Sequence, residues 1–534
     1  MDVDQRMPMA ALELPLVMPS VTLVRPELGL DAIAFGGASV RQSTIVDAAD
    51  ARLLRTGVVL TRSVDPAGGP AFWELTFPDW LEAPAIRAEQ PGGSPGDPVV
   101  DGVDPPHELA DRLVPFVRNA PLTDLARMSV KRSRWALKDT AGTSAVLVDD
   151  TVTLRRGEVA VARYREAGVE PVGCSPQALG WLCDTLESAG ATLLEEPVPL
   201  PIRLGAPATG LPDLPEPDPI GDDDPAAVLY AALLRADARD LWRSDAAVRL
   251  HRRSSLRALH RSLRRLRSDL MAFAAMLDPA AVDEVAADIE WFDEQITAAR
   301  DLEALRRRLT DSSTGAPTAA PFAHPAGSPT DRDELGDLGD ALAGMEDSQR
   351  RRVVAALGLP RYRRMLDGVV GLVRNPGATL RRDEATLVRE ATQSAREWVR
   401  SHLGPGLAEM GQQVRRADRP GADLTTVWPG VHAAADTLQV VGRAAAEIDA
   451  EGGHRLERST RKLASRVERV AAGSAAAEDM RRLALRGSAP DPAVVFALGE
   501  ASAAARAEAG ALADDLLLTW PRRRARLERK GTRS

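Results

Sequence analysis

Aromatic residues are scarce in this chain: Phe, Trp and Tyr together make up 4% of its 534 residues. The hydrophobic cores must therefore rest on Ala, Leu and Val, a choice that suits helices better than sheets. The chain has two cysteines, Cys174 and Cys183, which are too few for a disulfide framework and lack the spacing of metal ligands. A reducing compartment is the simpler interpretation.

The sequence also lacks the patterns of a signal peptide and of a membrane-spanning segment. The N-terminus carries acidic residues where a signal peptide has a basic start, and no apolar run approaches the length of a membrane span. We therefore expect a cytoplasmic protein that does not bind a membrane. The formal net charge of −9 argues against nucleic acid as a partner, although a local arginine patch can outweigh the total.

The chain changes character near residue 205, and its length predicts two to four domains. Before this point, helices are predicted at 107–118 and 176–189, and Gly36-Gly37 reads as a turn. Short Val-, Leu- and Thr-rich runs separated by Gly, Pro and Asp predict strands at 57–62, 71–77, 128–137 and 144–154. This mixture indicates an α+β domain with an antiparallel sheet.

A Pro- and Asp-rich segment at 205–224 predicts a linker. We expect one domain at 1–204, a helical domain at 225–525 with a flexible Pro/Ser/Thr-rich loop near 310–333, and a frayed basic tail at 526–534. The apolar periodicity predicts helices at 225–250, 251–275, 279–309, 347–359, 361–374, 381–403, 430–448, 454–471, 475–486 and 491–519.

One of these helices, between Arg252 and Phe273, combines an apolar face with a basic stripe. The stripe lies about 100° around the helix, Arg261 and Arg265 extend it, and its members are Arg253, Arg257, His260, Arg264 and Arg267. Like charges at this spacing destabilise a helix by roughly 0.2–0.5 kcal/mol per pair. A bound polyanion would offset that cost, since guanidinium groups donate to phosphate in a fork. Acidic residues from a neighbouring helix are the alternative.

A second basic stripe lies on the helix predicted at 454–471. Its members are Arg455, Arg458, Lys462, Arg466 and Arg469. A solvated surface explains this stripe as well as a ligand does.

Several motifs of the helical region resemble the CHAD domain, the conserved-histidine α-helical domain. Leu256 to Ser268 (LRALHRSLRRLRS) resembles its signature helix, although Arg257 and His260 stand in exchanged positions. Ile289 to Leu309 is similar to the family's Trp-containing helix, and Leu357 to Leu372 to its R-Y helix.

In the second half, Val431-His432 matches the repeated L-H motif, but Gln439 and Gly442 replace the Lys and Arg that follow it, while Arg443 remains. The resemblance implies an all-α domain of two antiparallel four-helix bundles with a basic surface that binds inorganic polyphosphate. The implied contacts are Arg253, Arg257, His260, Arg261, Arg264, Arg267, Arg300 and His432.

The N-terminal region resembles a CYTH domain, the triphosphate tunnel fold. Val46 to Arg62 (VDAADARLLRTGVVLTR) and Phe72 to Pro78 (FWELTFP) carry the resemblance, which covers roughly residues 20 to 200. It implies an antiparallel β tunnel or barrel. The residual tunnel residues would be Arg87, Glu89, Arg127, Lys131, Arg132 and Asp149.

The catalytic carboxylates of that family are missing. An active tunnel needs an E-x-E-x-K strand whose paired carboxylates hold a divalent metal, but residues 10–24 offer only Glu13, Thr76 replaces the tunnel lysine, and the late E-x-E strand keeps only Glu166. We expect no catalytic residues, no metal and no cofactor, with Mg²⁺ or Mn²⁺ required only if the tunnel is active.

Three hypotheses follow from these residues. The first is a polyanion-binding protein whose partner is inorganic polyphosphate. The second is a metal-dependent triphosphatase or polyphosphatase in the tunnel, and the third is a helical scaffold for a protein partner or for self-association. Nucleic acid is disfavoured by the net charge and by the lack of aromatic residues among the arginines.

Overall fold

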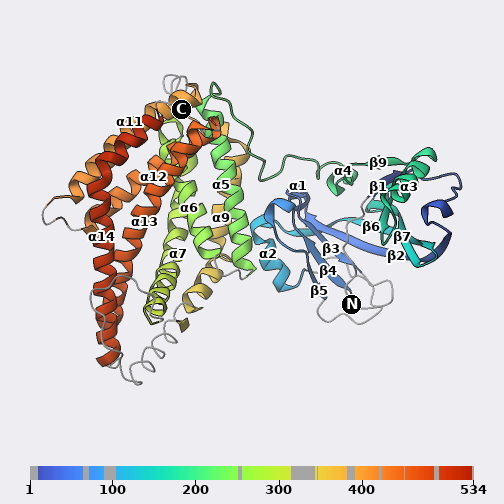
Figure 1. The fold of residues 1–534 in the computed structure, drawn as a ribbon, viewed down its shortest axis with the longest axis horizontal. Helices are drawn as coiled ribbons and strands as arrows, with labels where there is room; N and C mark the ends of the chain where they lie inside the picture. The colour runs from blue at the N-terminus through green and yellow to red at the C-terminus, as the bar shows by residue number, and fades with distance from the viewer. Residues whose placement is uncertain are drawn as a thin grey trace. The chain divides into compact units, whose positions relative to one another are not determined.

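The computed structural model describes residues 10–63, 71–89, 104–250, 255–313, 343–344, 347–381, 391–419, 422, 424–449, 451–485 and 492–531. The chain divides into two compact units, residues 1–213 and 214–534. The first unit contains all described strands and the second contains the long helices (Figure 1).

The first unit is built on one nine-stranded antiparallel sheet, which confirms the predicted α+β class. The strands are β1 (Ala10–Leu14), β2 (Ala32–Ala48), β3 (Val59–Ser63), β4 (Phe72–Thr76), β5 (Ile86–Glu89), β6 (Leu122–Asp139), β7 (Gly142–Arg156), β8 (Val159–Pro171) and β9 (Thr192–Leu194). Their order is β5-β4-β3-β2-β6-β7-β8-β1-β9. Among the described strands, β5 and β9 each have one neighbour, so the sheet is open where a tunnel would be closed.

Four helices accompany the sheet: α1 (Arg52–Arg55), α2 (His107–Val117), α3 (Pro176–Ser188) and α4 (Leu200–Leu204). The helices expected at 107–118 and 176–189 are confirmed. Ser175 caps α3, because its Oγ accepts a hydrogen bond from the Ala178 amide at 3.2 Å. Leu182 and Leu186 of α3 pack with Leu12 and Val169 of the sheet, and these residues belong to one hydrophobic core.

The turn expected at Gly36-Gly37 is instead a bulge inside the long strand β2. The register against β6 shifts between Phe35 and Gly37, and Gly37 adopts a φ of 120°. At this bulge the backbone of Gly37 takes a positive φ, which glycine adopts at low cost. The two glycines therefore bend a strand rather than end it.

Asp47 is a buried carboxylate at the end of β2. Its Oδ1 accepts hydrogen bonds from the amides of Ala48 and Leu53 at 2.6 and 3.0 Å, and its Oδ2 accepts one from Leu54 at 2.9 Å. These bonds hold the start of α1 against the strand. Burial raises the pKa of Asp47 to about 6, although the three backbone hydrogen bonds act in the opposite direction.

This carboxylate predicts a pH dependence of stability. Between about pH 4 and pH 6 the folded state keeps a proton on Asp47 that an unfolded aspartate, with its ordinary pKa of 3.8, has lost. The contribution to the free energy of unfolding is therefore present at low pH and lost as the pH rises, by on the order of 3 kcal/mol. Urea titrations across this range should show the wild type losing stability relative to Asp47→Asn as the pH rises. A pH-independent difference would contradict the prediction.

The segment expected to be a linker is anchored on both sides. In the first unit, Asp213 accepts hydrogen bonds from Arg118 and Arg55 at 2.5 and 3.0 Å. In the second unit, Asp218 pairs with Arg235 at 2.5 Å, and Glu216 with Arg239 at 3.0 Å. The acidic residues of this segment thus neutralise arginines of the domains.

The second unit consists of long helices. They are α5 (Ala226–Arg249), α6 (Ser255–Ala272), α7 (Pro279–Ser313), α9 (Pro360–Arg374), α11 (Ala395–Ala417), α12 (Leu424–Ile448), α13 (Gly452–Leu485) and α14 (Pro492–Gly531), and residues 347–356 are also helical. Consecutive packing joins α5, α6, α7 and α9 in one set and α11, α12, α13 and α14 in another. Contacts of α6 with α12 and of α7 with α13 join the two sets.

Several helix boundaries differ from the expected ones. Residues 454–471 and 475–485 belong to the single helix α13, and α14 continues to Gly531, so residues 526–531 are helical rather than frayed. Residue 486 lies outside the described residues. Of the helix expected at 381–403, residues 382–390 lie outside the described residues, and residues 395–403 belong to α11, which runs through Pro405. A Cβ on Gly406 would lie 3.0 Å from Leu438, so close packing on α12 continues the helix past this proline. Of the expected loop at 310–333, residues 314–333 lie outside the described residues.

Candidate functional site

The basic stripe on α6 is positioned by the apolar face of the same helix. All six apolar residues of that face are buried: Leu256, Leu259, Leu263, Leu266, Leu270 and Phe273. The predicted face is therefore confirmed. Because this face is fixed against the core, the basic residues beside it lie along the line where α6 approaches α7 and α12.

Arg264 is the centre of the contacts between α6 and the second set of helices. One of its terminal nitrogens (Nη2) lies 2.8 Å from His432 Nε2 and 2.5 Å from Asp436 Oδ2, and the other (Nη1) lies 3.9 Å from Glu468. His432 and Arg264, predicted from separate motifs, are thus in direct contact. Asp436 and Glu468 were not expected here, and they neutralise this arginine.

Two other predicted residues face acidic partners on α7. Arg267 pairs with Glu290 at 2.7 Å, and the buried His260 lies 3.3 Å from Asp293 through Nε2. The stripe is therefore matched largely by carboxylates from neighbouring helices, which was the alternative to a bound polyanion. Local sequence cannot distinguish the two cases, because these carboxylates are more than twenty residues away along the chain.

The remaining members of the predicted set have different positions. Arg257 is exposed on α6. Arg261 is also exposed and, within the part of the chain that the structure describes, has no hydrogen bond or ion pair. Arg253 lies outside the described residues. Arg300 belongs to the helix α7, but its side chain is not among the described ones.

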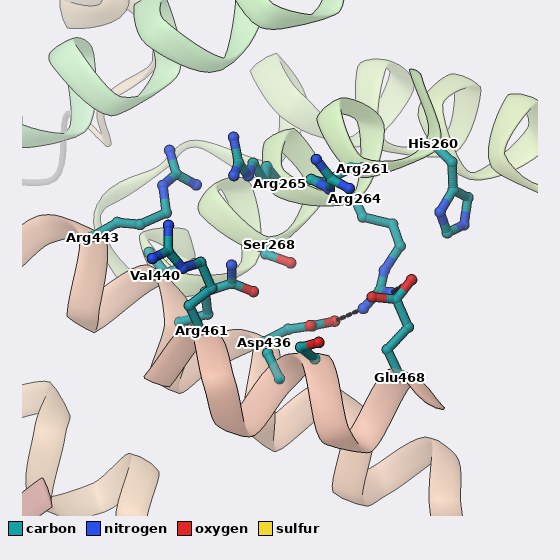
Figure 2. A pocket seen from close by; sticks show the side chains of 13 residues that line it. His260, Arg261, Arg264, Arg265, Ser268, Asp436, Val440, Arg443, Arg461 and Glu468 are labelled. Atoms are coloured by element: carbon teal, nitrogen blue, oxygen red, sulfur yellow. Dashed lines mark hydrogen bonds and ion pairs between the residues drawn. The ribbon is translucent and has the colours of Figure 1, made fainter. Parts of the chain in front are cut away.

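A pocket of about 300 Å³ lies between α6, α12 and α13. Its basic residues are Arg261, Arg264, Arg265, Arg443 and Arg461, and its acidic residues are Asp436 and Glu468. In Figure 2 the guanidinium groups of Arg443, Arg265 and Arg261 follow one another along one wall, while Asp436 and Glu468 stand opposite. The pocket therefore has a basic side and an acidic side.

Two buried carboxylates hold Arg443 in place. It lies 2.8 Å from Asp237 and 3.3 Å from Asp269. Burial lowers the pKa of Arg443, but the attraction of Asp237 and Asp269 outweighs burial, so the net pKa is raised. Burial raises the pKa of Asp269 well above its ordinary value, and Arg443 offsets this only in part. The guanidinium is fixed in place and remains charged.

Arg265 and Arg461 have weaker local partners. Arg265 lies 3.2 Å from Asp240, and the half-exposed Arg461 lies 3.5 Å from Glu457 one turn earlier in α13. Partly exposed pairs at these distances contribute less than fully buried ones, and solvent-exposed pairs typically contribute below about 1 kcal/mol. An anion in the pocket can therefore recruit both side chains at small cost.

A second cavity of about 270 Å³ adjoins the first, since both are lined by His260, Arg264 and Asp436. Arg267, His432 and Asp293 line the second cavity. Most of the predicted α6 residues thus lie along two neighbouring cavities. Arg264 stands between them.

Three of the pocket's arginines were not among the predicted contacts: Arg265, Arg443 and Arg461. Arg265 was expected only to extend the basic stripe of α6. A signal existed for Arg443, because Asp436, Gln439 and Arg443 recur at spacings of three and four in an otherwise apolar, Ala-rich helix. Arg461 carried no such signal. It precedes Lys462 of the second basic stripe, and only the packing of α13 against α12 directs it to the pocket.

The six residual tunnel residues do not gather in one place. Strand alternation places Arg127 and Lys131 on the same face of the sheet as Asp149, because Ser133 pairs with Asp149, whereas Arg132 pairs with Asp150 on the other face. Arg132 is bound to Asp150 at 2.6 Å, and Asp149 to Arg165 at 2.7 Å.

The other two tunnel residues, Arg87 and Glu89, lie exposed on β5. The Arg87 guanidinium stacks 3.4 Å from the Phe72 ring centroid, which accounts for its position without a ligand.

The two carboxylates left from the tunnel signatures are neighbours across β1 and β8. Glu13 pairs with Glu166 in the strand register, and Arg203 bridges them at 2.8 and 3.1 Å. Burial raises the pKa of Glu166, and Arg203 lowers it in part. A divalent cation would have to displace this guanidinium. Among the described residues, no three His, Cys, Asp or Glu side chains stand together as metal ligands.

A family model matches part of the helical unit. Residues 232–427 match the CHAD domain family. Solved structures similar to this chain include the CHAD domain from the plant Ricinus communis, with 19% identity, a TM-score of 0.42, and coverage of 55% of this chain and 95% of that one. PptA from Streptomyces chartreusis has 20% identity and a TM-score of 0.41, and the coverage is 56% and 99%.

No curated protein matches this chain. None of the described helices is both long and apolar enough to cross a membrane. The CHAD match begins at residue 232, after the sheet, and ends at residue 427, at the start of α12. The helical unit of this chain therefore carries a CHAD domain.

Proposed function

We propose that this protein binds inorganic polyphosphate in the pocket between α6, α12 and α13. The observation that carries the proposal is the convergence of five arginines from three helices on one pocket, beside the signature helix of a CHAD domain, a family linked to polyphosphate binding. The two sets of four packed helices support the two-bundle arrangement that the family resemblance implies.

The chemistry of the basic wall favours phosphate over a carboxylate ligand. Guanidinium groups donate in a planar fork, stay charged, and pair with phosphate oxygens in two parallel hydrogen bonds. Arg261, Arg265 and Arg443 present three such groups in sequence along one wall (Figure 2). A row of forks fits a linear anion with repeated phosphates better than a single compact anion.

The ion pairs of the α6 stripe change the roles expected for its members. Asp436 and Glu468 already neutralise Arg264, and Glu290 neutralises Arg267. These two arginines would reach a ligand only by giving up carboxylate partners. We therefore assign the main contacts to the weakly held side chains of Arg261, Arg265 and Arg461. Arg443, which Asp237 and Asp269 hold in place, adds a fixed positive charge to the wall, and His432 and Arg264 lie at the edge of the pocket.

The proposal predicts that removing two weakly held pocket arginines impairs binding. We expect Arg261→Ala combined with Arg461→Ala to raise the Kd for long-chain polyphosphate at least tenfold at low salt, because each lost charge-assisted hydrogen bond costs about 1.5 kcal/mol or more. Isothermal titration calorimetry measures this change. The salt dependence of binding should also become shallower, since fewer counterions are exchanged.

The matched control replaces two exposed arginines of α11, Arg400→Ala with Arg416→Ala, which removes the same charge away from the pocket. This control should bind nearly as the wild type does. An equal loss of affinity in both variants would show that the effect depends only on net charge. An unchanged affinity in the pocket variant would overturn the proposed site. Unchanged circular dichroism would show that both variants are folded.

A further inference from the structure

A second group of cations lies where α13 and α14 pack side by side (Figure 1). We call it the α13–α14 basic cluster. It contains four residues of α13 and three of α14: Arg455, Arg458, Lys462, Arg466, Arg523, Arg526 and Lys530. The α14 residues follow one face of the helix at spacings of three and four. The α13 residues belong to the second basic stripe that the sequence predicted, whereas the α14 residues were not expected to join it.

Direct contacts fix the two helices together at this cluster. Lys530 Nζ donates to Ser459 Oγ at 2.5 Å and to the Arg455 carbonyl oxygen at 3.1 Å. Burial lowers the pKa of Lys530, and the surrounding charges of Arg526, Arg458, Arg455 and Lys462 lower it further. The end of α14 therefore adds its positive charge to the start of α13.

The carboxylates near the cluster are too few to neutralise it. Among the described residues, Asp515 pairs with Arg466 and Arg523 at 2.7 and 3.6 Å. The exposed Glu451 lies 3.8 Å from Arg455. Within the described chain, the middle of the cluster has no ion pair: Arg458, Lys462 and Arg526. This balance is the reverse of the α6 stripe, whose charges face carboxylates.

The cluster is separate from the pocket, with which it shares no residue. Arg461 lines the pocket, and the adjacent Lys462 points about 100° away around α13. The row from Arg455 to Arg466 spans eleven residues, or about 16 Å along the helix, which accommodates several phosphate groups. No aromatic residue belongs to the cluster, so it offers no stacking platform for nucleic-acid bases.

We propose that the α13–α14 basic cluster is a second binding site for a linear inorganic polyphosphate, independent of the pocket on α6. The ligand neutralises the unpaired charges of Arg458, Lys462 and Arg526. Like charges held together by packing repel one another, and a bound polyanion removes that repulsion.

Lysine reactivity tests this proposal directly, because the whole chain has four lysines: Lys131, Lys138, Lys462 and Lys530. The protein would be acetylated at amines with and without long-chain polyphosphate, and each lysine followed by mass spectrometry. We expect Lys462 to react severalfold more slowly with polyphosphate present, while the exposed Lys138 of β6 reacts unchanged. The same protection should persist in the Arg261→Ala/Arg461→Ala pocket variant.

A second variant removes the cluster itself. Arg458→Ala with Arg526→Ala relieves repulsion, so folding should be preserved, and protection of Lys462 should be lost while pocket binding remains. Absence of protection in the wild type, with calorimetric binding intact, would refute the second site but not the proposed function. Protection that disappears in the pocket variant would refute its independence. Equal protection by single-stranded DNA at the same phosphate concentration would assign the cluster to nucleic acid instead.

Discussion

Replacing Asp436 by Asn should make this protein bind polyphosphate more tightly. Asp436 lines the pocket opposite the arginine wall and lies 2.5 Å from Arg264. In the wild type it both repels an incoming phosphate and occupies a guanidinium that the phosphate could use. Asn keeps the size of the side chain while removing the charge, and His432 still contacts Arg264 at 2.8 Å.

We expect the Kd to fall about tenfold, which corresponds to about 1.4 kcal/mol, when measured by calorimetry at low salt. The matched control is Glu409→Gln, an exposed carboxylate of α11 that also removes one negative charge. Its effect should be small, because charges further than a Debye length of about 10 Å are screened. Weaker binding in Asp436→Asn would show that Arg264 is needed in its present position and that the acidic side belongs to the site.

Replacing Asp245 by Ala should strongly destabilise the helical unit. Asp245 is fully buried on α5, where its Oδ1 accepts from Arg249 Nε at 2.7 Å and its Oδ2 from the Tyr362 hydroxyl of α9 at 2.8 Å. Burial raises the pKa of Tyr362, and the charge of Asp245 adds to this shift. Removing the carboxylate takes away a buried counter-charge that Arg249 contacts at 2.7 Å, at a cost of about 3–5 kcal/mol.

The expected readout is a fall of the Tm on the order of 10 °C in thermal unfolding followed by circular dichroism. Tyr362→Phe, which loses only one hydrogen bond, should show a smaller shift, since a single buried bond contributes about 1 kcal/mol. The exposed-pair control is Asp218→Ala, which breaks an ion pair with Arg235 and should cost less than about 1 kcal/mol. Equal shifts for the buried and exposed variants would contradict the role given to this network.

The sequence alone was sufficient for the local features of the helical unit. The apolar face of α6 follows from leucines at spacings of three and four, and all of them are buried. The motifs on α6 and α9 indicated a CHAD domain, and residues 232–427 match that family. In the first unit, alternating Val, Leu and Thr runs predicted strands that belong to one antiparallel sheet. These features depend on neighbours within one or two turns, which periodicity records directly.

Helix boundaries were less predictable, because packing between distant segments decides them. The helices expected at 454–471 and 475–486 left a gap that contains Gly473, and glycine inside a helix costs about 1 kcal/mol relative to alanine. Yet α13 continues through it while packed against α12 and α14. Similarly, Pro405 did not end α11, where Gly406 allows close contact with Leu438 of α12.

The charge balance of the candidate site was decided only by the tertiary structure. The sequence shows a stripe of arginines on α6, but Asp436, Glu290 and Asp293 reach it from other helices. It shows a row of cations on α13, but Arg526 and Lys530 join that row only through the packing of α14. An ion pair depends on distances of a few ångströms between atoms, and those distances are set by how helices pack. The sequence therefore determined where the positive charges lie on each helix, and the fold determined which of them remain for a ligand.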